Sequence, residues 1–274
     1  MLGFIVPVKA KSTSHDWERD NELLRNTLQS LCNQDNPAFK IFVVYTDMPY
    51  YIEDVNVTYI QYPFDYVKAK EMSDYEDFVK PQFEDRMAQG VFDKGKRISY
   101  ACRFAKMQGC TFIMSVDSDD LVSNKIASYI NEHKDEKYGW YVDKGFIQLT
   151  NSKVLIKVPH NMNHLNGSTN IAQVKLIPDF SDDTKSLRDV SFFIGHGYMH
   201  DRILQEYNDT IKPLPFYAII YVLHGTNWST YDKILKTNFL KTMVKFVTRG
   251  KWLSKKIKKE FGIKSNVRTL SNEQ

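Results

Sequence analysis

FIMSVDSDDLVS, residues 112–123, sets three aspartates directly after a run of large apolar residues. The apolar run is typical of a buried strand, and alternate residues of an extended segment project to the same side. Asp117 and Asp119 are therefore expected to face one way, and a divalent cation would remove the repulsion between them. Mg²⁺ and Mn²⁺ suit such oxygen ligands, together with the phosphate oxygens of a substrate. Asp120 is expected to cap a helix that follows.

The segments on both sides of this strand predict an α/β fold. GFIVPV (3–8) and IFVVYTD (41–47) read as buried strands, and a helical pattern of leucines lies between them. GKRISYACRFAKMQGC (95–110) predicts a helix that Gly109 ends, immediately before the apolar run. Strands that alternate with helices form a mostly parallel sheet. The aspartates then lie at the carboxyl end of a central strand, where open α/β sheets bind ligands.

The net charge of +4 is unevenly distributed along the chain. Residues 241–264 hold nine Lys or Arg against the single Glu260, so this segment carries +8 and residues 1–240 carry −4. An apolar stripe at helical spacing runs through the segment: Leu253, Ile257 and Phe261. The pattern is typical of a helix that lies on an anionic membrane surface, and packing of the stripe on the body is the open alternative. Nucleic acid is not expected as a partner, because the body is acidic and no nucleic-acid-binding motif is present.

The cysteines and the hydropathy pattern indicate where in the cell the protein is expected. Cys32, Cys102 and Cys110 share no metal-ligand spacing, and their odd number argues against a disulfide framework. They are expected to be small buried apolar residues. No apolar stretch reaches the length of a transmembrane helix. We expect a cytoplasmic protein, or one that is peripheral on the inner face of the membrane.

The order of these elements resembles a known family. GFIVPV, a helix, IFVVYTD and then DKGKRISYACRFAKMQGCTFIMSVDSDDLVS are similar to the nucleotide-sugar-binding half of GT-A glycosyltransferases, and more narrowly to the large inverting family that builds bacterial polysaccharides. The likeness extends more loosely through GWYVDKGFIQ, LNGSTNI and VLHGTNWS. It implies a three-layer α/β/α fold with a mostly parallel central sheet. Residues 1–230 would form the GT-A domain, with the nucleotide-sugar half in 1–125 and the acceptor half in 126–230, and residues 231–274 a basic helical extension.

The resemblance also implies roles for individual residues. Asp119 would contact the metal, and Asp117 would contact the metal and the hydroxyls of the sugar or ribose. Asp120 would support these ligands or cap the helix, and His224, at the end of the late strand PFYAIIYVLH, would make a further metal or diphosphate contact. The remaining nucleotide contacts would come from Pro7, Val8, Lys9, Asp47, Lys94 and Arg97. The last two, at the start of the helix in DKGKR, would offset the charge of the leaving diphosphate.

The catalytic base is expected in the polar segment DFSDDTKSLRDVSFFIGHGYMHDRI. An inverting transfer needs a carboxylate or imidazole within hydrogen-bond reach of the acceptor hydroxyl. Asp183 and His196 are the preferred candidates, and Asp189 and Asp201 also qualify by residue type. Aromatic and amide side chains that could form an acceptor platform, or be structural, are Trp140, Trp228 and Asn166.

The sequence therefore predicts a metal-dependent glycosyltransferase. It would move a sugar from a nucleotide-diphosphate donor to a glycan or lipid-linked acceptor in surface polysaccharide synthesis, with Mn²⁺ or Mg²⁺ as cofactor. One alternative is a nucleotidyltransferase of similar sheet architecture, although PVKAKSTSHDW lacks the Gly-rich loop expected after its first strand. The other is a non-catalytic, membrane-associated binding protein.

Overall fold

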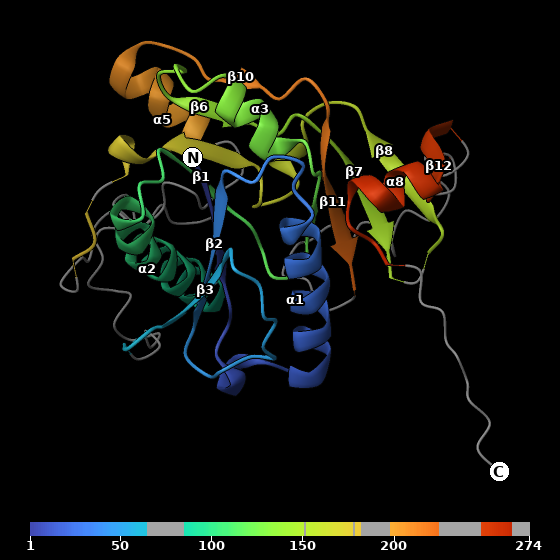
Figure 1. The fold of residues 1–274 in the computed structure, drawn as a ribbon, viewed down its shortest axis with the longest axis horizontal. Coiled ribbons are helices and arrows are strands. Elements are labelled where there is room, and N and C mark those ends of the chain that lie inside the picture. Colours follow the sequence, from blue (N-terminus) through green and yellow to red (C-terminus); the bar gives the residue numbers. More distant parts are fainter. Residues whose placement is uncertain (65–84, 151, 178, 182–197, 225–247, 265–274) are drawn as a thin grey trace.

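The computed structural model describes residues 1–64, 85–150, 152–177, 179–181, 198–224 and 248–264. Two sheets organise these residues, one of seven strands and one of five. Figure 1 shows the larger sheet at the centre, with α1 and α2 on opposite sides of it and the smaller sheet beside it.

The seven-stranded sheet is parallel except for one strand. Its strands in spatial order are β10 (Lys212–Pro213), β6 (Gly139–Tyr141), β9 (Asn170–Gln173), β4 (Phe112–Ser115), β1 (Leu2–Pro7), β2 (Phe39–Tyr45) and β3 (Val57–Gln61). Only β9 runs against its neighbours β4 and β6. The inner strands are apolar on both faces, as expected for a sheet that helices cover on both sides.

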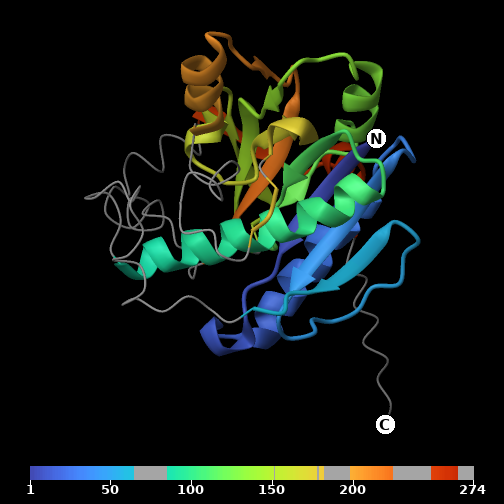
Figure 2. The same ribbon diagram turned by 90° about the vertical axis from the view of Figure 1, so that its left-hand side faces the viewer.

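Helices cover the two faces of this sheet in separate layers. Helices α1 (Trp17–Cys32) and α3 (Ile126–Glu132) bury apolar side chains in the cluster that includes Phe4 and Val6. Helices α2 (Asp85–Met107) and α5 (Tyr198–Tyr207) pack on the other face, around Ile5. Figure 2 shows α2 lying across its face of the sheet. The predicted α/β fold, with a mostly parallel sheet between helices, is confirmed.

One face of α2 packs flat on the sheet. Its buried members are Ile98, Ala101, Cys102 and Ala105. The helix begins at Asp85, ten residues before Gly95, so the prediction that Lys94 and Arg97 mark a helix start is wrong. Both basic side chains instead project from the middle of a long helix.

The five-stranded sheet lies against the carboxyl-terminal part of the described chain. Its strands in spatial order are β12 (Gly250–Trp252), β8 (Val154–Val158), β7 (Lys144–Leu149), β11 (Tyr217–Leu223) and β5 (Leu121–Val122). Strands β7 and β11 are parallel, and the other pairs are antiparallel. Short 3₁₀ turns are η1 (Lys11–Thr13), η3 (Met162–His164) and η4 (Val174–Leu176).

Helix α8 (Lys255–Glu260) packs its apolar stripe on this second sheet. Ile257 is 5% exposed and Phe261 is 1% exposed, and both lie in a cluster with Phe146 and Leu155. The expectation that the stripe faces a membrane is therefore wrong for these residues, and the alternative of packing on the body holds. Within the described residues, no helix combines the length and the apolar character needed to cross a bilayer. Residues 231–247, the first part of the predicted extension, lie outside the described residues.

Candidate metal and nucleotide site

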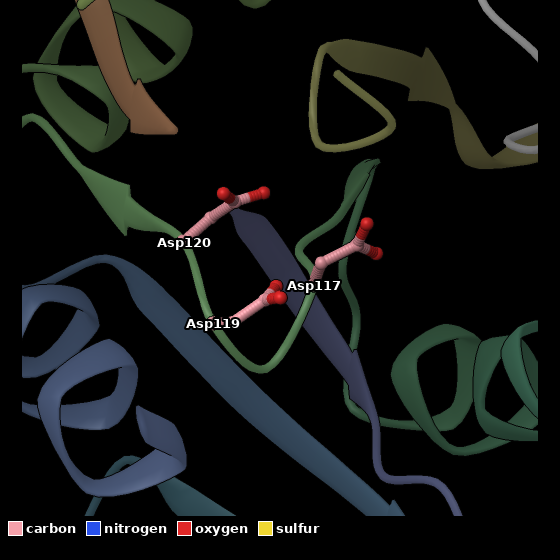
Figure 3. A group of neighbouring side chains, drawn as sticks. All are labelled: Asp117, Asp119 and Asp120. Atoms are coloured by element: carbon pink, nitrogen blue, oxygen red, sulfur yellow. The ribbon is translucent and has the colours of Figure 1, made fainter. Parts of the chain in front are cut away.

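The three aspartates arise from one turn between β4 and β5. Their candidate ligand atoms all lie within 4.8 Å of one another. The segment is not extended as predicted, because the amide N–H of Asp120 donates to the carbonyl of Asp117 at 3.1 Å and closes a turn. Figure 3 shows the side chains of Asp117, Asp119 and Asp120 projecting from this turn. The turn gathers three carboxylates into a volume that one cation can neutralise.

Asp120 is the most buried member of the cluster, with 0% of its surface exposed. Its Oδ2 accepts hydrogen bonds from Asn166 Nδ2 at 2.8 Å and Ser168 Oγ at 2.6 Å. Burial, and then the charges of Asp119 and Asp117, raise the pKa of Asp120, while these two hydrogen bonds act against the rise. The predicted helix cap is wrong, because α3 begins at Ile126 and long-range donors hold the carboxylate instead.

The other oxygen of this carboxylate fits a metal site. Among the described residues, Oδ1 of Asp120 has no hydrogen-bond partner although it is buried. A buried carboxylate oxygen without a partner is costly, and two further carboxylates beside it add repulsion. A divalent cation would satisfy the oxygen and offset the charge together. The residues present therefore fit Mn²⁺ or Mg²⁺, both of which prefer oxygen ligands.

A polar loop that the sequence did not assign to the cluster forms its support. Ser168 Oγ accepts from the amide N–H of Asp117 at 2.7 Å and donates to Asp120, so one hydroxyl joins two members of the cluster. Asn166 Oδ1 in turn accepts from the amide of Ser168 at 2.7 Å. Asn166, considered an acceptor platform, is buried and serves this network instead. The available signal was the uncharged polar run NGSTN directly before a buried strand.

His224 lies against Asp119, although 105 residues separate the two in the sequence. Its Nε2 is 2.7 Å from Asp119 Oδ2, and the residue is 7% exposed at the end of β11. Arg19 of α1 donates from Nη2 to the carbonyl of His224 at 2.9 Å, which fixes the backbone that carries the ring. The structure thus brings together two of the side chains that the sequence assigned to the metal.

Lys94 contacts the cluster from α2 and forms an ion pair with Asp117. The loop approaches this pair closely at Gly167, where an added Cβ would lie 3.2 Å from both Asp117 Oδ2 and Lys94 Nζ. Glycine therefore lets the loop pass beside the ion pair without displacing it. The amine places one positive charge at the edge of the carboxylates, open in part to solvent.

Arg97 is placed inside the protein rather than on a solvent-facing helix start. It is 1% exposed, and its guanidinium donates to Asp93 from Nε at 2.7 Å and Nη2 at 3.3 Å. The guanidinium carbon lies 4.6 Å from the ring centroid of Tyr62. Its charge is thus neutralised within the layer between α2 and the sheet.

The ends of β1 and β2 lie at the same edge of the sheet as the aspartate turn, because these strands are parallel to β4. Pro7 and Val8 are buried there. Lys9 pairs with Asp20 at 2.8 Å, and Asp47 Oδ2 accepts from the amide of Lys11 at 2.7 Å. The last contact ties the loop after β2 to the loop after β1.

The residues predicted for catalysis are not placed by the structure. Asp183 and His196, together with Asp189 and Trp228, lie outside the described residues. Asp201 is exposed on α5, with His200 at 3.5 Å. Trp140 is not an acceptor platform, because it is 1% exposed and packs on Phe112 with ring centroids 5.0 Å apart.

No protein-family model matches the sequence, and no curated protein matches it. Residues 1–349 of TarS from S. aureus resemble the chain at 16% identity and a TM-score of 0.44, over 90% of this chain and 66% of that one. The complex of this fragment with UDP-GlcNAc resembles the chain at 14% identity and a TM-score of 0.41, over 90% of this chain and 67% of that one. The glycosyltransferase GlyE from Streptococcus pneumoniae TIGR4 resembles it at 12% identity and a TM-score of 0.33, over 88% of this chain and 63% of that one. The chain thus spans about two thirds of the length of the TarS fragment and of the GlyE chain.

Proposed function

We propose that this protein is a metal-dependent glycosyltransferase that uses a nucleotide-diphosphate sugar as donor. The observation that carries the proposal is the cluster of Asp117, Asp119 and Asp120 at the carboxyl end of a central parallel strand, with His224 on Asp119. Open α/β sheets bind ligands at this edge, and a bound cation would relieve the repulsion among carboxylates that lie this close together. The donor diphosphate would share that cation with the protein.

Each residue has a task in this proposal. Asp119, Asp117 and His224 would hold the metal, and Asp120, which anchors the turn through Oδ2, would offer its buried Oδ1 to the same ion. When bound, the metal neutralises the charge that develops on the diphosphate leaving group. Lys94 contributes a second positive charge at the same edge, and the ends of β1 and β2 cradle the nucleoside.

The second half of the reaction rests on the predicted base. Asp183 or His196 would take the proton from the acceptor hydroxyl as it attacks the anomeric carbon from the face opposite the diphosphate. The outcome would be inversion. The acceptor in this proposal is a glycan or a lipid-linked glycan of a surface polysaccharide.

Attachment to an anionic membrane would use charge rather than the buried stripe. Lys255, Lys256 and Lys259 of α8 are exposed, and Trp252 beside them is 71% exposed. Each such basic residue contributes about 1 kcal/mol near an anionic leaflet. Co-sedimentation with vesicles that contain phosphatidylserine, at low and high salt, measures this electrostatic contribution to membrane binding.

An activity assay tests the proposal and separates it from the alternatives. Purified protein is incubated with UDP-, GDP- and dTDP-sugars and Mn²⁺, and released nucleoside diphosphate is measured. We expect release from one donor class, its loss with EDTA, and its loss in Asp119→Asn but not in the control Asp135→Asn, which changes an exposed aspartate. Release of pyrophosphate from a nucleoside triphosphate would instead identify a nucleotidyltransferase. A metal-independent protein that turns over none of these compounds would be a binding protein.

A further inference from the structure

A cavity of about 220 Å³ lies on the five-stranded sheet, and nothing in the proposed donor site uses it. Aliphatic side chains of β7 and β8, among them Ile147 and Ile156, line one part of it. The polar part of the lining holds one amide, Asn161, and four basic side chains: Lys157, His160, His164 and Arg249. The cavity therefore combines an apolar wall with several hydrogen-bond donors.

The charged side chains that line this cavity are a lysine and an arginine. No aspartate or glutamate lines it among the described residues, and the chain between Asp143 and Asp179 contains four lysines and no acid. Asp143, the acid that precedes this stretch, is already engaged: its Oδ2 lies 2.9 Å from His160 Nδ1, and its Oδ1 accepts from the amide of Asn161 at 2.7 Å. Asp143 thus orients the imidazole of His160, which lines the cavity.

One loop connects the cavity to the aspartate cluster. Leu165 lines the cavity, and the next residue, Asn166, donates to Asp120. The loop is fixed on both sides of this point, because the amide of Met162 donates to the carbonyl of Asp143 at 3.0 Å and the amide of Val142 donates to the carbonyl of Thr169 at 2.8 Å. A ligand in the cavity would thus bind beside the wall of the donor site, where the acceptor of a transfer belongs.

We propose that this cavity binds a phosphate group of the acceptor. That the ligand is the acceptor rests on the proposed function. That the ligand carries a phosphate rests on the cavity alone. A phosphate offers several oxygens to converging donors, and arginine binds it through two parallel hydrogen bonds. The charges of Lys157 and Arg249 provide the attraction, and the aliphatic wall takes the carbon part of the ligand next to the phosphate.

Isothermal titration calorimetry with sn-glycerol 3-phosphate, at low ionic strength, tests the proposal without any donor sugar. We expect the wild type to bind it and the double variant Lys157→Gln/Arg249→Gln to bind at least tenfold more weakly. The control is Lys153→Gln/Lys175→Gln, which removes the same charge from two exposed residues outside the cavity. Phosphatidylcholine vesicles doped with phosphatidic acid form a second arm, in which loss of binding in the first double variant alone identifies a lipid phosphate.

Three results would overturn the proposal. They are no binding of either probe by the wild type, an equal loss in the two double variants, and unchanged binding in Lys157→Gln/Arg249→Gln. A cooperative urea unfolding transition reports that the variants are folded. Stabilisation by UDP with Mn²⁺ is measured on the same samples, and it fails independently if the donor site is wrong while the phosphate site is right.

Discussion

Ser168→Ala probes the support of the aspartate cluster without removing any carboxylate. The hydroxyl is buried, accepts from the amide of Asp117 at 2.7 Å and donates to Asp120 Oδ2 at 2.6 Å. Alanine leaves a partly buried N–H without this partner and takes one of two described donors from a buried carboxylate. Both effects act on the turn that positions the proposed metal ligands.

The expected loss of stability follows from these two hydrogen bonds. A neutral hydrogen bond contributes about 1 kcal/mol and one to a charged group about 2 kcal/mol, so the free energy of unfolding should fall by about 3 kcal/mol. Ser152→Ala is the matched control, because Ser152 Oγ also makes two hydrogen bonds, to Val154 N and Val154 O. Ser152 is half-exposed, so water replaces the lost bonds and the change should stay below about 1 kcal/mol.

Urea unfolding with EDTA gives the stability of each variant, and calorimetry with Mn²⁺ gives the metal affinity. We expect Ser168→Ala to lower both and Ser152→Ala to leave the metal affinity unchanged. If Ser168→Ala costs no more than the control and binds Mn²⁺ like the wild type, the loop does not position the cluster, and the reasoning from these contacts is refuted.

Three further predictions follow from burial and charge. Ile257→Ala should lower the free energy of unfolding in urea by about 2–4 kcal/mol, and Trp252→Ala by less than about 1 kcal/mol, because only the first side chain is buried. Equal losses in the two variants would mean that α8 does not pack on the sheet. Burial raises the pKa of the Cys32 and Cys102 thiols to about 12 and that of Cys110 to about 11, so the native protein should react slowly with Ellman's reagent at pH 8, and rapid titration of all three thiols would contradict this. The pKa of Asp120 is raised above its ordinary 3.8, so its contribution to stability is present below pH 3.8 and is lost as pH rises through the raised pKa. In urea unfolding, the stability of the metal-free wild type relative to Asp120→Asn should therefore fall as pH rises. A difference in stability that does not change with pH would contradict the raised pKa.

The sequence predicted the parts of the site that depend on strand ends. Carboxyl ends of parallel strands meet at one edge, so the aspartates after β4 and the residues after β1 and β2 could be placed together from their order alone. Lys94 could be assigned to the same edge, although the start of its helix could not. These contacts follow from regular elements, whose periodicity is readable in one dimension.

The remaining contacts depend on packing between distant segments. The role of Ser168 has no periodic signal, because a short polar residue forms local and long-range hydrogen bonds equally well. Asp120 shows the same ambiguity. A local helix cap was expected for its side chain, and donors 46 and 48 residues away hold it instead. The stripe around Ile257 suits a bilayer or a protein core alike, because both remove apolar surface from water, and only the sheet beneath α8 decides between them.

Calorimetric titration with UDP, GDP and dTDP, each with and without Mn²⁺, tests the central claim most directly. The account predicts that one nucleoside diphosphate binds, only when Mn²⁺ is present, and that Asp119→Asn abolishes this binding while its urea unfolding remains cooperative. Binding that is the same with EDTA, or an Asp119→Asn variant that binds like the wild type, would contradict a metal-dependent donor site at the aspartate cluster.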